Sequence, residues 1–251
     1  MRTTRFTSTK LQSSGKKGIL KPDADGYYEL IVGGLNAYNS SGEFYTLESA
    51  CQLFESSSIL MRRISKGALK SELGHPKIKP GMTNDQFLQR ILTLEETNIS
   101  GHFSEIWLDH QYGKKNPQCG NPELVAIMAK VRPSGPHGPA LEASLNNPKE
   151  NVSFSVRGLT DNYYQKGKCI RVLTTIVTFD QVVEQGIPQA NKWDAPALES
   201  LSEQIVTEDS LRRIVEDRSP IAVESTRELA NQALQAVRLS ELPKIPLWSK
   251  W

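Results

Sequence analysis

Cysteine is scarce in this 251-residue sequence, and long apolar runs are missing. The three cysteines, Cys51, Cys119 and Cys169, lie far apart, with no CxxC pair and no cysteine–histidine ligand spacing, which argues against a disulfide framework and a zinc site. No apolar stretch has the length needed to cross a bilayer, and the N-terminus has no apolar signal core. We therefore expect a soluble cytoplasmic protein with reduced thiols and with no metal, cofactor or membrane contact.

A strong excess of one charge is also missing. The chain has 30 Lys and Arg against 28 Asp and Glu, and its formal net charge of +2 is too close to neutral to indicate general nucleic-acid binding. Basic residues do cluster in 2–21 and 62–79, but these clusters lack the interleaved aromatic side chains that stack on bases. We expect no specific nucleic-acid partner.

Hydrophobic residues make up only 38% of the chain, which is low for a fully compact protein, so we expect polar appendages around one core. Residues 1–17, rich in Thr, Ser, Lys and Arg, are predicted to form a flexible N-terminal arm. Residues 18–190 are predicted to form the core domain. Residues 191–251 are charged and helix-prone and are predicted to form a C-terminal helical extension.

Strand patterns dominate the core domain, with a few helices between them. Period-two alternation predicts strands, and apolar residues at helical spacing predict helices. The expected fold class is α+β, with strands at 27–35, 99–108, 124–131 and 168–178 and with helices at 46–70, 84–94 and 140–145. The first helix, interrupted near three serines at 56–58, runs toward His75 and is expected to help carry it.

The stretch from Asn151 to Gly158 combines a strand pattern with polar side chains suited to chemistry. Its residues alternate as in a half-buried strand: Val152, Phe154 and Val156 share one face, and Ser153, Ser155 and Arg157 share the other. The glycine that follows allows a sharp turn or a close approach to a ligand. The strand is therefore predicted to present two hydroxyls and a guanidinium together.

One histidine is a plausible base for such a serine. His75 lies in Glu72-Leu73-Gly74-His75-Pro76, where the flanking glycine and proline confine the imidazole to a rigid corner. A serine hydroxyl becomes a good nucleophile only when a base takes its proton and donors receive the oxyanion. We interpret Ser155 as nucleophile and His75 as base of a serine peptidase, with Arg157 and Gly158 near the oxyanion. Taken singly, each residue also fits an ordinary strand or turn role, so the prediction depends on their joint occurrence.

Several stretches, in order, resemble the prohead (procapsid) proteases of tailed bacteriophages, of the myophage and giant phiKZ-like type. The resemblance covers roughly residues 18–190, and its most specific part is Gly-His-Pro at 74–76, followed by Ser-x-Arg-Gly and then by a strand ending in aspartate. One position departs from a common form, because Val156 stands where a second serine often precedes the arginine. The other matching stretches are the strand before Gly33-Gly34, then Asn39 with Gly42 and Tyr45, then 106–108 and 177–182.

The resemblance implies roles and a fold. It makes His75 the general base, Ser155 the nucleophile and Asp180 the third member that orients the imidazole. The related herpesvirus assemblins use a second histidine instead, for which His102 or His110 would be the counterpart here, and this alternative stays open. The implied fold is a β-barrel-like core surrounded by helices, similar to the herpesvirus protease, which makes residues 18–190 a serine protease domain.

The resemblance also implies substrates. Such enzymes act inside the immature capsid in the host cytoplasm, cut scaffold or core proteins and the major capsid protein after glutamate, and finally cut themselves. Glu199, Glu203 and Glu224 each follow a small or apolar residue two positions earlier, and self-cleavage there would remove the extension, although any charged helix contains glutamates at this frequency. A homodimer or a higher oligomer is left open.

Two other functions compete with this prediction. The first is a catalytically inactive structural or scaffold component of the procapsid, supported by the helix-prone extension and the aromatic end at Trp248 and Trp251. A complete set of serine, histidine and aspartate argues against it. The second is an ester hydrolase, which would be expected to carry the Gly-x-Ser-x-Gly elbow that this sequence lacks.

Overall fold

The computed structural model describes residues 3–12, 22–39, 41–147, 150–183, 204–216 and 224–239. Ten strands occur in these ranges: β1 (Thr3–Gln12), β2 (Tyr28–Leu35), β3 (Ala37–Tyr38), β4 (Phe44–Tyr45), β5 (Lys70–Glu72), β6 (Ile99–Asp109), β7 (Val125–Pro133), β8 (Ser153–Gln165), β9 (Lys168–Val182) and β10 (Gln204–Thr207). They form a six-stranded sheet in the order β10-β1-β8-β9-β4-β3 and a four-stranded sheet in the order β2-β7-β6-β5.

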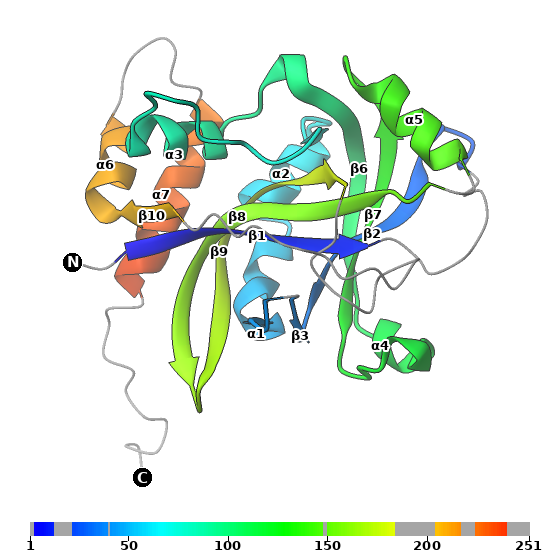
Figure 1. Cartoon of the computed structure of the whole chain (residues 1–251), viewed down its shortest axis with the longest axis horizontal. Coiled ribbons are helices and arrows are strands. Elements are labelled where there is room, and N and C mark those ends of the chain that lie inside the picture. The colour runs from blue at the N-terminus through cyan, green and yellow to red at the C-terminus, as the bar shows by residue number, and fades with distance from the viewer. Residues whose placement is uncertain are drawn as a thin grey trace.

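Helices pack around these sheets (Figure 1). The α-helices are α1 (Leu47–Ala50), α2 (Ile59–Ser65), α3 (Asn84–Leu92), α4 (Tyr112–Lys115), α5 (Gly138–Asn146), α6 (Glu208–Glu216) and α7 (Glu224–Leu239), and the short 3₁₀ helices are η1 (Cys51–Phe54), η2 (Glu96–Asn98) and η3 (Pro117–Cys119). The combination of sheets and helices confirms the mixed helix and strand class expected from the sequence. No helix in the described ranges is long and apolar enough to span a membrane.

The two sheets share one hydrophobic core. Phe103 of β6 packs edge-on against Phe154 of β8 and Phe179 of β9, with ring centroids 5.9 and 6.1 Å apart. All three rings are fully buried. The apolar face predicted for the serine strand is therefore the face that packs between the sheets. The opposite face is buried as well, so the strand is not half-buried as expected.

A second apolar cluster covers that opposite face. Leu159 of β8 and Val177 of β9 pack there with leucines of α3, α6 and α7, which gather at one end of the molecule in Figure 1. Helix α3 is well specified by its sequence, because Thr83 and Gln86 form a reciprocal capping box at its start. The side chains that α3 buries are Phe87, Leu88, Ile91 and Leu92.

The expected helix over 46–70 is divided at its serines, as the sequence indicated, but its last residues are not helical. Ser58 caps the separate helix α2 by accepting a hydrogen bond from the Met61 amide at 3.1 Å, and α2 ends at Ser65. The chain then becomes β5, which pairs with β6, so a strand and not a helix leads to His75. Pairing with the distant strand β6 determines the conformation of this segment. The local periodicity of apolar residues does not predict such pairing.

Both ends of the chain also differ from the expected appendages. In the segment expected to be a flexible arm, β1 pairs along β8 from Arg5 opposite Thr160 to Gln12 opposite Ser153. In the expected extension the helices are present, but β10 adds a further strand by pairing with β1. Helices α6 and α7 pack on α3, β8 and β9, so the apolar faces of the extension are buried against the core domain.

Candidate active site

The polypeptide after β5 brings His75 onto β9. Leu73 forms a parallel bridge with Gln181, and the Gly74 amide donates to the Gln181 carbonyl at 2.6 Å. Gly74 has φ of +74°, a left-handed conformation that favours glycine, and this turn directs the next residue back toward the strand. As a result, His75 Nδ1 lies 2.8 Å from Oδ2 of Asp180.

Ser155 lies beside this pair. In the antiparallel pairing of β8 and β9, Ser155 is directly opposite Asp180. Side chains directly opposite each other share one face of a sheet, with Cβ atoms about 5 Å apart. Both residues are fully buried, whereas the His75 side chain is 15% exposed. Within the described residues, Nε2 of His75 is buried without a hydrogen-bond partner, and the contact of the ring with Asp180 is made by the other nitrogen, Nδ1.

Arg157 has a different place from the one expected. Its guanidinium holds Asp180 with two bonds, from Nε to Oδ2 at 2.8 Å and from Nη2 to Oδ1 at 2.6 Å. The same group lies 3.0 Å from Glu72 and donates to the Thr93 carbonyl at 3.1 Å. Because the side chain is fully buried in these contacts, it supports the carboxylate from behind and is not directed at an oxyanion.

Gly158 also has a packing role that the sequence pattern did not show. A Cβ built there would lie 2.2 Å from the carbonyl oxygen of Thr175 on β9, so only glycine allows the two backbones to approach. The ladder shifts register between Arg157 and Gly158. Since β8 is flanked by β1 and β9, its backbone in this region takes part in sheet pairing on both sides.

A second buried carboxylate balances the cluster. Glu72 accepts hydrogen bonds from Arg90 of α3, at 2.5 and 3.2 Å, and from the Glu95 amide at 2.5 Å. Two carboxylates, Glu72 and Asp180, therefore face two guanidiniums, of Arg157 and Arg90. A buried ionic cluster is tolerated when its charges are paired and its hydrogen bonds are satisfied, and both conditions are met for these carboxylates.

The charges keep these carboxyls ionised. Burial raises the pKa of Asp180, but the charge of Arg157 and the hydrogen bonds from His75 and Arg157 outweigh it and hold the pKa below its ordinary value. Burial likewise opposes ionisation of Glu72, but the hydrogen bond from Arg90 and the charge of Arg157 lower its pKa. Asp180 is thus an anion that can orient an imidazole and stabilise its protonated form.

The remaining predicted residues lie elsewhere. His102, one alternative third member, bonds to the hydroxyl of Tyr27 at 2.9 Å and to the carbonyl of Gly67 at 3.0 Å, and His110 is exposed after the end of β6. Asp180 binds Nδ1 of His75, which is the nitrogen that His102 or His110 would have to bind as a third member. Among the proposed self-cleavage sites, Glu224 is the first residue of α7, whereas Glu199 and Glu203 lie outside the described residues.

Sequence reasoning missed three members of the cluster, Glu72, Arg90 and Thr93. Glu72 stands in the quoted motif three residues before His75, and that proximity is the one signal that could have found it. Arg90 lies on the polar side of a short amphipathic helix, where an arginine is ordinary. The described residues hold no group of three or more His, Cys, Asp or Glu side chains that could bind a metal ion.

A buried carboxylate on an imidazole, with a serine on the adjacent strand, is typical of serine hydrolases. Comparison with known families assigns the chain to a narrower class of proteins. Residues 6–239 match the Peptidase S80 family, and the chain belongs to that family.

A relative from a phage, together with the family, confirms the resemblance to phage prohead proteases that the sequence indicated. Over 217 residues the chain is 37% identical to the capsid maturation protease of Pseudomonas phage phiKZ, and the match covers 84% of this chain and 78% of the relative. The solved structure of the bacteriophage T4 capsid assembly protease, gp21, is also similar, with a TM-score of 0.48 and 15% identity over 72% of this chain and 99% of the other.

Proposed function

We propose that this chain is a serine endopeptidase that matures a phage prohead, with Ser155 as nucleophile, His75 as general base and Asp180 as the orienting carboxylate. The observation that carries the proposal is the placement of Ser155 opposite Asp180 while Asp180 binds Nδ1 of His75. This leaves Nε2 of the same ring for the hydroxyl proton. Asp180, and not a second histidine, is the third member.

The chemistry that follows is acyl transfer in two stages. The Ser155 oxygen attacks the peptide carbonyl while its proton moves to Nε2 of His75, and the C–N bond breaks as that proton passes to the leaving amine. Water then attacks the acyl ester, gives its proton to the same nitrogen, and releases the carboxylate product as the serine regains its hydrogen. Asp180 stays ionised and stabilises the imidazolium at each stage.

The proposed substrates are the scaffold or core proteins and the major capsid protein, cut after glutamate inside the immature capsid in the host cell. The printed name of the phiKZ relative supports capsid maturation as the setting. We further propose that the chain cuts itself at one or more of Glu199, Glu203 and Glu224. In this proposal residues 18–190 are the protease domain that carries the site in a barrel-like core, and β1 and β10 from outside this range add strands to its larger sheet.

The test compares three variants of the full chain. Purified protein is incubated with capsid and core proteins, and the products are read by mass spectrometry, which also gives the residue before each cut. Ser155→Ala and His75→Ala should lower kcat at least about 10³-fold, because each removes a member of a unit that acts together. Ser153→Ala is the matched control, since its buried hydroxyl has no partner within the described residues.

Full activity in Ser155→Ala, or loss confined to Ser153→Ala, would reject the assignment of the nucleophile. A wild-type protein that leaves every substrate and its own chain intact would favour an inactive structural component of the procapsid. Products that never end in glutamate would reject the proposed cleavage preference and leave the nucleophile assignment standing.

A further inference from the structure

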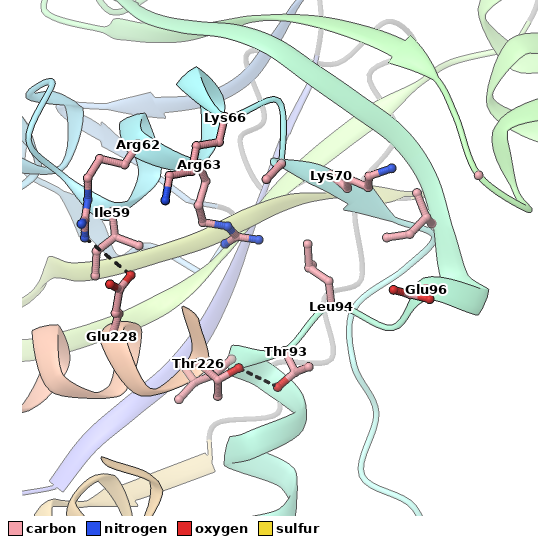
Figure 2. Close-up of a pocket in the computed structure, with 14 residues that line it drawn as sticks. Ile59, Arg62, Arg63, Lys66, Lys70, Thr93, Leu94, Glu96, Thr226 and Glu228 are labelled. Atoms are coloured by element: carbon pink, nitrogen blue, oxygen red, sulfur yellow. Dashed lines mark hydrogen bonds and ion pairs between the residues drawn. The ribbon is translucent and has the colours of Figure 1, made fainter. Parts of the chain in front are cut away.

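A cavity of about 740 Å³ lies between α2, the residues that follow α3, and α7. Figure 2 shows that its labelled cationic side chains come from one side, the α2–β5 segment: Arg62, Arg63, Lys66 and Lys70. The two acidic side chains that line it are Glu96 and Glu228. The cavity therefore carries an excess of positive charge, and the active-site proposal does not use it.

Most of this positive charge is not neutralised. In the described part of the chain, Lys66 and Lys70 have no ion pair, and Arg63 has no carboxylate partner but donates to the Val177 carbonyl at 2.7 Å. Burial, together with the nearby charge of Arg157, lowers the pKa of Arg63 to about 10. Because the half-buried guanidinium of Arg63 lies near the guanidinium of Arg157, binding of an anion beside it is electrostatically favourable.

One carboxylate already reaches the cavity. Glu228 of α7 lies 3.5 Å from Arg62, and both side chains are nearly half exposed. Apolar side chains also line the space, among them Ile59, Leu92 and Leu94. A cationic side with apolar neighbours fits a peptide in which acidic residues alternate with apolar ones. The carboxylates can pair with the cations while the apolar side chains pack against the apolar lining.

The cavity is adjacent to the active site but not at the bond to be cut. Two of its lining residues contact β9: Arg63 donates to the Val177 carbonyl, and the Lys70 carbonyl accepts from the Thr178 hydroxyl. Asp180 lies two residues further along the strand, a spacing of about 7 Å. Arg157, bonded to the carbonyl of the cavity residue Thr93, stands between the two places.

We propose that this cationic cavity binds an acidic segment of the polypeptide substrate that flanks the scissile bond at a distance of several residues. The proposal rests on the endopeptidase function proposed above and adds a recognition site to it. The carboxylates that the cavity binds belong to substrate residues other than the one whose carbonyl is attacked. Substrates with such a segment are held more tightly, and substrates without one are bound only at the catalytic residues.

The experiment measures binding without hydrolysis. The full chain with Ser155→Ala is titrated into a fluorescein-labelled peptide of alternating glutamate and leucine, and into the same peptide with glutamine in place of glutamate. Lys66→Gln with Lys70→Gln in this background should raise Kd for the glutamate peptide about tenfold at low salt. The matched control is Lys114→Gln with Lys115→Gln, two exposed lysines of α4 that remove the same charge.

Equal affinity in the two double variants, or equal affinity for the two peptides, would overturn the proposal. A single-stranded oligonucleotide of the same charge that binds more tightly than the peptide, and that also depends on Lys66 and Lys70, would overturn it in favour of a nucleic-acid site. Because the readout is binding to a protein without the Ser155 hydroxyl, a failure here is separate from a failure of the catalytic assignment, which only the cleavage test reports.

Discussion

At the scale of single residues, Asp180 is the link between the imidazole and the rest of the molecule. It accepts from His75 on one side and from Arg157 on the other, and Arg157 in turn contacts Glu72. A planar guanidinium held by two bonds fixes the plane of the carboxylate, which a point charge such as lysine does less well. We infer that Arg157 is a positioning residue and not an oxyanion donor.

Arg157→Met should be strongly destabilising. The change leaves Asp180 and Glu72 buried without their shared cation, and breaking a buried pair in this way costs about 3–5 kcal/mol. The free energy of unfolding in urea measures the effect. Arg132→Met is the control, because this exposed arginine lies over the Tyr27 ring at 5.2 Å and its loss should cost at most about 1 kcal/mol. Similar losses in the two variants would contradict the role given to Arg157.

The cluster also makes stability depend on acid. The folded-state pKa values of Asp180 and Glu72 lie below their ordinary values of 3.8 and 4.5, so the unfolded chain binds more protons as the pH falls. The stability they contribute is present above those ordinary values and is lost as the pH falls toward the folded-state values. Unfolding free energies should be nearly constant above about pH 5.5 and decline below about pH 4.5.

Glu72→Gln provides the comparison for this pH dependence. It removes one of the two depressed carboxyls, so the decline between neutral and acidic pH should be shallower than in the wild type, each curve being taken relative to its own neutral value. Urea titrations at several pH values measure both slopes. Identical slopes would mean that other carboxyls control the acid sensitivity.

At the scale of elements, the close pairing of β8 and β9 places Ser155 opposite Asp180. Gly158→Ala would put a Cβ 2.2 Å from the Thr175 carbonyl oxygen, and because that atom belongs to the backbone, the strands themselves must move. We expect a loss of about 1–3 kcal/mol, as for overpacked sites, together with lower peptidase activity. Thermal unfolding and a peptide-cleavage assay measure the two effects.

Gly138→Ala at the start of α5 is the control for that variant. Its Cβ would lie 3.3 Å from the carbonyl carbon of Pro133, a tight contact but a far less severe one than at Gly158, and its φ is not positive, so the change should cost clearly less than Gly158→Ala. A stable and fully active Gly158→Ala protein would show that the close approach of the strands is not needed for the site.

At the scale of the whole molecule, the two ends of the chain complete the structure around the site. β1 separates β8 from β10, and α6 and α7 bury leucines of α3, the helix that carries Arg90. An ion pair of 2.8 Å between Arg213 of α6 and Asp85 of α3 adds to this contact. The helices of the extension therefore support the active-site cluster indirectly, through α3.

A chain ending at residue 190 should be much less stable than the full chain. It would expose the apolar faces of α3, β8 and β9 that α6 and α7 cover, and exposed faces of this kind favour aggregation. Circular dichroism during heating, with light scattering, measures Tm and aggregation. A chain ending at Leu239 is the control because it keeps both helices, and equal Tm values for the two would show that residues 18–190 are sufficient.

Local sequence patterns predicted a good part of this structure. Alternation placed Ser155 and Arg157 on one face of β8, and apolar spacing marked α3 within two residues of its observed end. Helical spacing also marked α7. These features depend on residues close together in the chain, where side-chain periodicity and hydrogen bonds to the adjacent backbone decide the conformation.

What the sequence determined by itself is the set of chemical groups and their faces: a serine, an imidazole in a rigid turn, and an aspartate on a β-branched strand. Tertiary structure alone decided that Arg157 supports Asp180, that Glu72 and Arg90 balance it, and that β1 and β10 join the larger sheet. The reason is that strand neighbours and ion pairs are chosen by contacts between distant segments, as when the Gln181 amide meets the Ser71 hydroxyl. No local pattern encodes the register of such contacts.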